Sequence, residues 1–141
     1  MENLSIQLTI IIRVLFALFL GLLIGIERQK RKTESKNRGA AGLRTYTLVC
    51  IGTALITSIG VLLFPGDPIR LAASIMAGIG FIGAGAIISS EKKMMGLTNA
   101  AGIWAIASIG IASGIGLYLV ALASALITIF IFQLRRFESI E

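Results

Sequence analysis

The sequence predicts an all-α protein, an integral membrane helical bundle of about five transmembrane helices. Its apolar residues form about five blocks between Leu8 and Leu134, and its charged residues lie almost entirely between those blocks. Only 14% of the 141 residues are charged and 56% are hydrophobic, whereas about a quarter of the residues of a soluble domain are charged. A bilayer is therefore the expected solvent. Residues 1–141 are expected to form one membrane domain, because a single bundle uses the whole length.

The first expected span covers residues 8–26 and contains a single charge, Arg13. A helix needs about 20 mostly apolar residues to cross a hydrocarbon core of about 30 Å, and this block meets that requirement. A signal peptide is the alternative interpretation. Its apolar core would be only about 7–15 residues long and would follow a basic segment, which is missing here. We interpret the block as a retained span.

Turn residues and charges divide the rest of the chain. Residues 65–68 hold two prolines and a glycine, which should end a helix, and residues 90–93 form a charged hinge. As one helix, residues 97–134 would be about 57 Å long, too long for one crossing. A break is therefore expected among Gly110, Ser113, Gly114 and Gly116. The predicted spans are 8–26, 45–64, 69–89, 97–112 and 117–134.

The distribution of Lys and Arg predicts the orientation. The loop from Arg28 to Arg44 is rich in both, and the hinge and the segment after Leu134 add further basic residues on the same side. Positive residues favour the cytoplasm, so the N-terminus should lie outside and the C-terminus inside a bacterial inner membrane, with an anionic cytoplasmic leaflet as neighbour. This placement also explains the net charge of +6 without nucleic-acid binding. Interfacial anchors are expected at Tyr46 inside and at Phe64 and Tyr118 outside.

Arg13 shares a helical face with small residues at four-residue spacing, Ala17, Gly21 and Gly25. Small residues let helices approach closely in lipid, and a charge within a span usually faces protein. Arg13 either pairs with Asp67 at the outer turn or extends to the lipid headgroups. The sequence leaves both alternatives open.

Two further polar groups lie at the expected cytoplasmic side. Glu27 ends the first span and either pairs with Arg44 or Lys93 or remains solvated beside Arg28. Thr98 and Asn99 begin the fourth span, where they would cap the helix or contact a ligand.

Glycines crowd the third and fourth spans, at Gly78, Gly80, Gly83, Gly85, Gly110 and Gly114. Close helix packing is the expected role, and backbone carbonyls exposed to a solute are the alternative. The pattern GIGFIG from residue 78 also matches a dinucleotide-binding fingerprint. That motif requires a strand before it and a helix after it, whereas this pattern lies in the middle of an apolar helix, so we reject a dinucleotide site.

An enzyme is not expected. The chain has no His, a single Asp and a single Cys, so it lacks the usual nucleophile pairs, an aspartyl dyad and an intrachain disulfide. No cofactor is expected, and whether a metal binds is unknown. Cys50 is interpreted as a packed small side chain.

The segments RVLFALFLGLLIGIERQ, AGLRTYTLVCIGTALITSIG, DPIRLAASIMAGIGFIGAGAII and GLTNAAGIWAIASIGIASGIGLY resemble the membrane domain of the MgtC/SapB family over about residues 13–118. The resemblance implies a small bacterial inner-membrane protein linked to growth under magnesium limitation. Tyr46 replaces a frequent His, and no ACT-like domain is expected after Arg136, as in short members. The polar residues that it singles out are Arg13, Asp67, Arg70, Glu27, Arg28, Arg44, Thr98 and Asn99.

Two functions remain open. One is a regulatory or interaction protein in magnesium homeostasis or stress adaptation, acting as a homo-oligomer, with a dimer favoured, or with another membrane protein. The other is a cation (Mg²⁺) transporter or channel subunit. Mg²⁺ prefers oxygen ligands that include carboxylates, and Glu27 and Asp67 are expected at opposite faces of the membrane, so the first function is preferred.

Overall fold

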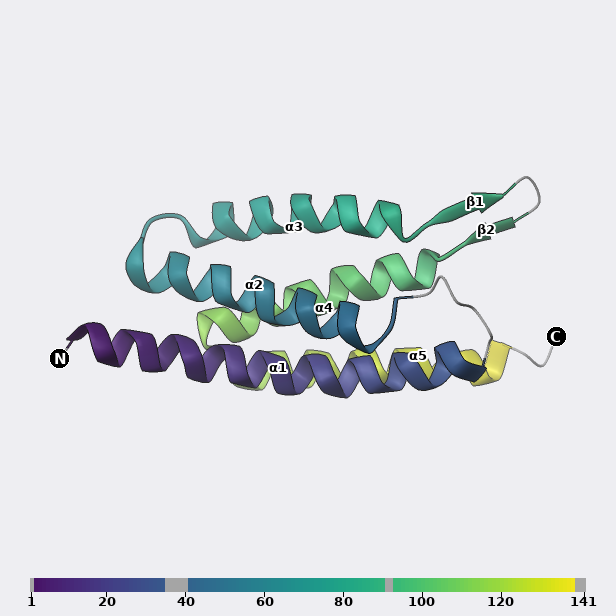
Figure 1. The fold of residues 1–141 in the computed structure, drawn as a ribbon, viewed down its shortest axis with the longest axis horizontal. Coiled ribbons are helices and arrows are strands. Elements are labelled where there is room, and N and C mark those ends of the chain that lie inside the picture. The colour runs from purple at the N-terminus through teal and green to yellow at the C-terminus, as the bar shows by residue number, and fades with distance from the viewer. Residues whose placement is uncertain (1, 35–40, 91–92, 139–141) are drawn as a thin grey trace.

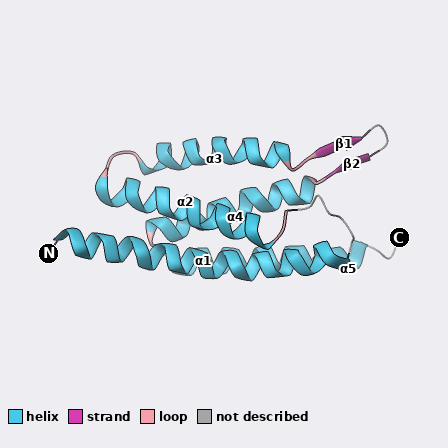
Figure 2. Cartoon of the chain, viewed as in Figure 1, coloured by secondary structure: helices cyan, strands magenta, loops and turns pink. Residues whose placement is uncertain are grey.

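The computed structural model describes residues 2–34, 41–90 and 93–138. It contains five helices and one short hairpin that follow one another along the chain (Figures 1 and 2). They alternate in direction, so the two ends of the chain lie at opposite ends of the bundle. The elements are α1 (Glu2–Glu34), α2 (Leu43–Leu63), α3 (Pro68–Gly85), β1 (Ile88–Ser90), β2 (Lys93–Met95), α4 (Leu97–Ile115) and α5 (Tyr118–Glu138).

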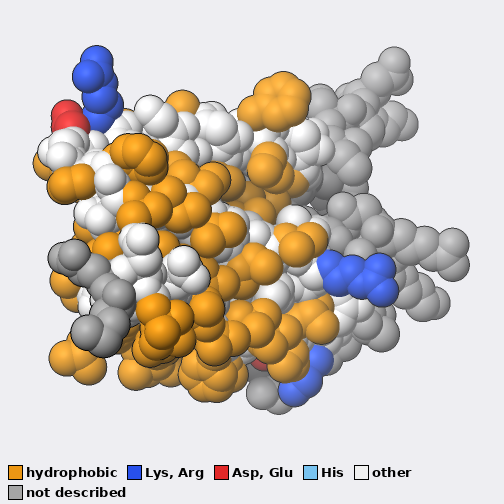
Figure 3. All heavy atoms as spheres, turned by 60° about the vertical axis from the view of Figure 1, so that its left-hand side comes forward, with side chains coloured by type: hydrophobic (Ala, Val, Ile, Leu, Met, Phe, Trp, Pro, Cys, Tyr) orange, Lys and Arg blue, Asp and Glu red, His pale blue; other side chains and the backbone are white. Residues whose placement is uncertain are grey.

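The expected helical membrane bundle is confirmed. Within the described residues, four helices are long and apolar enough to cross a membrane, and α5 contributes a shorter apolar segment, Tyr118–Leu134. In Figure 3 hydrophobic side chains cover the middle of the visible face, whereas charged side chains lie towards its two ends. Many large apolar side chains are exposed along α1 and α5, as helices that face lipid require. The chain is therefore a multi-pass membrane protein.

Helix α4 forms the centre of the bundle and contacts each of the other four helices. Its apolar side chains Ile103, Ile106 and Ile109 are fully or almost fully buried. They pack with Leu20 and Ile24 from α1 and with core residues of α2 and α5. The middle of α4 consists largely of isoleucines and small residues, a composition that lets several helices approach one axis.

Glycines set the close approach of α2 to α1 and α4. A Cβ atom added to Gly21 of α1 would lie 3.0 Å from the Cα atom of Thr47, and one added to Gly25 would lie equally close to the Cα atom of Leu43. On the other side of α2, a Cβ atom at Gly114 of α4 would lie 2.6 Å from the carbonyl oxygen of Ala54. Real Cβ atoms essentially never approach as closely as the contact at Gly114, so that position requires glycine, whereas at Gly21 and Gly25 a Cβ atom would force α2 to shift by a few tenths of an ångström.

Helix α3 packs much more loosely. Only Ile79 and Gly83 are buried in it, and Gly83 faces Ala100 of α4. A Cβ atom added to Gly78, Gly80 or Gly85 would have no heavy atom of another residue nearby, apart from the local backbone. The predicted packing role of these three glycines is therefore not fulfilled inside the described chain, and α3 forms one edge of the bundle (Figure 1).

Several predicted boundaries differ from the structure. The third span ends at Gly85, before the predicted residue 89, because the chain enters the hairpin in which Ile88 pairs with Met95. The fourth span continues through Gly110 and Gly114 to Ile115, since of the residues expected at the break only Gly116 takes the left-handed conformation, with φ of 98°. Helix α1 extends beyond the membrane-spanning part to Glu34. Part of the predicted hinge, residues 91–92, lies outside the described residues.

Candidate functional site

Arg13 of α1 binds the end of α4. Its Nη1 atom donates a hydrogen bond of 2.7 Å to the carbonyl oxygen of Gly114, and the hydroxyl of Ser58 donates to the same oxygen at 3.1 Å. The last carbonyl oxygens of a helix accept no hydrogen bond from an amide of the same helix, and they carry partial negative charge. In α4 the neighbouring carbonyls of Ala112 and Ser113 already accept from backbone amides of the following turn. Arg13 therefore satisfies a carbonyl that the helix cannot satisfy itself.

Gly116 makes room for this contact. Its φ of 98° is a conformation that other residues rarely adopt, and a Cβ atom at this position would lie 3.0 Å from Nη2 of Arg13. Phe16, one turn further along α1, packs edge-to-face on Tyr118 at 5.0 Å between ring centroids. The turn between α4 and α5 is thus built around α1.

Arg28 of α1 binds the other end of α4. Its Nη2 atom donates to the side-chain oxygen of Asn99, in the first turn of α4. Its guanidinium lies 4.6 Å from the ring centroid of Phe132 and 5.9 Å from that of Tyr46, distances at which a cation is attracted to an aromatic face. The hydroxyl of Tyr46 in turn donates to the backbone carbonyl of Asn99 at 3.4 Å.

The environment of Arg28 is unusual for a cation. The N-terminal end of a helix carries partial positive charge, and α4 begins after Gly96 without a side-chain cap and without an acidic residue in its first turn. Arg28 is held there by an amide oxygen and two aromatic rings. Its Nε atom, like that of Arg13, is buried and has no hydrogen-bond acceptor within the described residues.

The two arginines match the two ends of α4 in spacing. Arg13 and Arg28 are 15 positions apart, as are Asn99 and Gly114, which corresponds to about 22 Å along a helix axis. Because α1 and α4 run in opposite directions (Figure 1), both contacts form at once. A shift of either helix by one turn would break both of them.

The predicted pairing of Arg13 with Asp67 is not found. Arg13 binds Gly114, whereas the carboxylate of Asp67 accepts the backbone N–H of Arg70 at 3.0 Å and caps the N-terminus of α3. Arg70 and Asp67 are both exposed. The alternative, an arginine extended to the headgroups, stays a prediction: the side chain of Arg13 is half-buried, and its Nη1 atom is bonded to Gly114.

The structure divides the predicted polar residues between the two ends of the bundle. Asp67 and Arg70 lie at the start of α3, near the α2–α3 turn, and the other predicted polar residues apart from Arg13 lie at the opposite end. There, Asn99 is buried and Glu27 is half-buried, whereas Arg44 and Thr98 are exposed. The predicted cap at Thr98 and Asn99 is wrong, because the N-cap position is occupied by Gly96. Within the described part of the chain, no three His, Cys, Asp or Glu side chains gather in a way that would hold a metal ion.

Sequence reasoning missed the residues that complete these contacts. Tyr46 was expected as an interfacial anchor, but it is fully buried beside Arg28. Gly102 was not singled out, although a Cβ atom there would collide with the hydroxyl of Tyr46 and lie 2.7 Å from Phe132. Ser58 was missed as well. The aromatic and hydroxyl residues carried no signal by themselves, because their role depends on helices that meet only in three dimensions.

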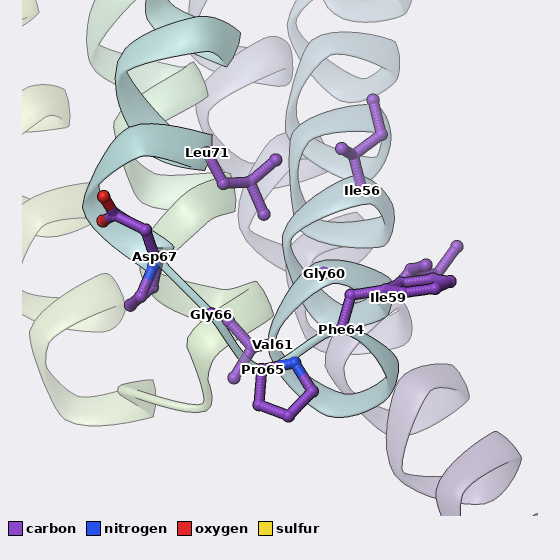
Figure 4. A pocket seen from close by; sticks show the side chains of 10 residues that line it. Ile56, Ile59, Gly60, Val61, Phe64, Pro65, Gly66, Asp67 and Leu71 are labelled. Carbon is purple, nitrogen blue, oxygen red and sulfur yellow. The ribbon is translucent and has the colours of Figure 1, made fainter.

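Two cavities lie between α2 and α3. The first, of about 590 Å³, is at the turn that joins the helices and is lined by residues such as Ile59, Phe64 and Asp67 (Figure 4). The second, of about 520 Å³, lies further from the turn and is lined by residues such as Leu48, Gly52 and Gly78. Ile56 borders both. We call the two cavities together the α2–α3 groove.

Comparison with known proteins identifies relatives of this chain. A model described as the MgtC family matches residues 14–139. Protein MgtC of Salmonella typhimurium is 40% identical over 127 residues, which cover 90% of this chain and 52% of that protein. The "Putative magnesium transporter YhiD" of Escherichia coli is 36% identical over 87% of this chain and 59% of its own length. Protein SapB of Bacillus subtilis is 37% identical over 83% of this chain and 52% of its own length.

The chain thus spans little more than half the length of these curated relatives. No solved structure matches it.

Proposed function

The chain belongs to the MgtC family, and from this premise we propose that it is a regulatory protein of the bacterial inner membrane that acts in magnesium homeostasis or stress adaptation by binding another membrane-embedded chain. The partner is a second copy or a different membrane protein. Support comes from the contrast between the tightly packed helices α1, α2 and α4 and the weakly covered helix α3.

The observation that carries the proposal is one face of α3. Ala73, Ala77, Gly80 and Ala84 recur at spacings of three and four and are all exposed. Small residues at such spacings let the backbone of a second helix approach closely in lipid. Inside the bundle, glycines at similar spacing in α1 and α4 already receive a neighbouring helix in this way. We call the α3 face the small-residue face.

A site-specific photocrosslinker tests the proposal. Placed at Gly80 in the full chain, it should capture one membrane protein of defined mass in cells, and placed at Phe130, an exposed residue of α5, it should capture none. The mass of the adduct distinguishes a second copy from a different protein. Capture at neither position, or equal capture at both, would contradict a docking role for α3.

A magnesium transporter is the second candidate, since the name of the Escherichia coli relative contains that activity. The charges next to α4 argue against a path for Mg²⁺ through one copy of this chain, because Arg13 and Arg28 flank its two ends and would repel a divalent cation. Magnesium flux into proteoliposomes made with the purified chain tests this candidate. Flux above that of protein-free vesicles would support it.

A further inference from the structure

Trp104 is an exposed aromatic residue in the apolar part of α4. Its side chain is 55% exposed, and it lies seven positions after Leu97, the first residue of α4, or about 10 Å along the helix axis. Within the described part of the chain, its indole N–H has no hydrogen-bond acceptor. Tryptophan is enriched at membrane surfaces, and a polar group in hydrocarbon needs a partner. The exposed indole therefore calls for a contact that the described residues do not supply.

Two contacts between α3 and α4 fix how these helices are aligned. A Cβ atom added to Gly83 of α3 would lie 3.8 Å from the Cβ atom of Ala100 of α4. At the next contact, the hydroxyl of Ser108 lies 3.8 Å from the sulfur of Met76. Because the two helices run in opposite directions (Figure 1), later positions in α4 lie level with earlier positions in α3.

Trp104 and Gly80 lie at the same depth. Trp104 is four positions from each of the two α4 residues that contact α3, and Gly80 lies between the two α3 residues that they contact. A helical side chain leans towards the N-terminal turn of its own helix, so the indole lies level with the gap between Gly80 and Ala84. The indole of the same copy does not fill that gap, since a Cβ atom added to Gly80 would have no heavy atom of another residue nearby, apart from the local backbone.

Both residues face away from α2. Gly78 and Ile82 line the cavity on the α2 side of α3, and Gly80 is two positions from each, which places it on the opposite side of the helix. Trp104 is exposed although α4 contacts α2 more extensively than any other helix, so its side chain also lies outside that contact. One outer surface of the α3–α4 pair thus carries a large exposed side chain beside a gap between small residues.

We infer that two copies of the chain form a dimer about a twofold axis normal to the membrane, with Trp104 of each copy packed between Gly80 and Ala84 of the other. Such an axis keeps every residue at its depth, so two residues can exchange contacts across it only when they lie level with each other. Trp104 and Gly80 meet this condition. The indole N–H then reaches backbone carbonyls that the small side chains leave accessible and that keep a second lone pair.

A second copy fits this surface better than an unrelated helix. An unrelated helix would have to fill the gap with a side chain of its own and would also have to accept the indole N–H of Trp104, whereas a second copy does both because one surface is used twice. The inference rests on the proposed function, since it identifies the chain that covers the small-residue face of α3 as a second copy.

Disulfide crosslinking between two differently tagged copies tests the geometry. In a Cys50→Ala background, one copy carries Ala101→Cys, on the exposed side of α4 three positions before Trp104, and the other carries Ala84→Cys. Mild oxidation in membranes should join the two tags in one product. Phe130→Cys, on the exposed face of α5, replaces Ala84→Cys in the control and should give no such product.

The affinity of the dimer tests the role of Trp104. Energy transfer between labelled copies in phosphatidylcholine vesicles measures the dissociation constant. Trp104→Ala and Gly80→Leu should each raise that constant at least about tenfold, as the loss of a central interface residue does. In the double variant, the leucine enters the space that the indole leaves, and the constant should recover part of that factor. Phe130→Ala, which removes a similarly exposed aromatic ring, should leave the constant unchanged.

No crosslink between residues 101 and 84, or an unchanged dissociation constant in Trp104→Ala, would overturn the inference. Helix content measured by circular dichroism shows that each variant is folded. The photocrosslinker at Gly80 separates such a result from the proposed function. Capture of a different membrane protein would then leave the proposed function standing without the dimer, whereas capture of nothing would contradict both.

Discussion

The guanidinium of Arg13 and the carbonyl of Gly114, 101 positions apart in the chain, share a hydrogen bond of 2.7 Å at the end of α4. Ser58 is the second donor to the same oxygen. A hydrogen bond that involves a charged group contributes about 1.5–3 kcal/mol to stability. The contact ties the first helix of the chain to the fourth, and it holds the half-buried side chain of Arg13 against the end of α4.

We predict that Arg13→Gln lowers the free energy of unfolding by about 1.5–3 kcal/mol, because the Gly114 carbonyl loses its charged donor. Thermal or denaturant unfolding in detergent measures the loss. Arg70→Gln is the matched control, since Arg70 is exposed and bonds to Asp67 only through its backbone N–H, and it should change stability by less than about 0.5 kcal/mol. In a double-mutant cycle, the changes in unfolding free energy caused by Arg13→Gln and Asp67→Asn should be additive. A coupling energy above about 1 kcal/mol would show instead that the two side chains interact.

We predict that Asn99→Leu destabilises the protein by about 1–3 kcal/mol, because it removes the acceptor of Arg28 inside the bundle. Asn99→Asp should retain most of the stability, because it keeps an acceptor oxygen and adds a negative charge at the N-terminal end of α4. The measurement compares the unfolding midpoint of each variant with that of the unmodified protein. If both variants are equally destabilised, the contact between Arg28 and Asn99 does not hold this end of α4.

We predict opposite effects of one methyl group at two glycines. Gly110→Ala should cost about 1–3 kcal/mol, the usual penalty of overpacking, because its Cβ atom would collide with Thr53 and lie 2.5 Å from the carbonyl oxygen of Cys50. Gly78→Ala meets open space and should stabilise α3 by about 0.5–1 kcal/mol through its higher helix propensity. If Gly78→Ala lowered stability as much as Gly110→Ala, the result would indicate that a second chain packs against Gly78.

We predict that residues 28–44 face the cytoplasm and that the α2–α3 turn faces the opposite side, because the basic residues are so unevenly distributed. The native Cys50 is replaced by Ala, and single cysteines are placed at Ser35 and Gly66. An impermeant thiol reagent added to intact cells should label position 66 and not position 35. Ser35 lies outside the described residues, so its labelling is read only as a topology marker, and reaction at that position would reverse the orientation.

Composition and turn residues were enough to predict five helices and, to within two residues, where the last four of them begin. Hydrophobicity reports which residues avoid water, and it therefore could not distinguish the end of α3 from the strand that follows it, where Ile88 is still apolar. It also could not choose Gly116 over Gly110 and Gly114 as the break, since a glycine serves close packing as readily as a turn. The partners of Arg13 and Arg28 depend on how α1 lies against α4, which no local pattern records.

The spacing of Arg13 and Arg28 also bears on how the chain enters the membrane during synthesis. The helix between them, residues 14–27, carries one acidic residue, at its very end, so this segment can be inserted with each arginine near a different surface of the bilayer. Neither guanidinium can find its acceptor until residues 97–115 have been made, 71 to 101 positions later. Until α4 has been synthesised, neither arginine of α1 has its acceptor. Packing of α4 against α1 is therefore the step that forms both hydrogen bonds.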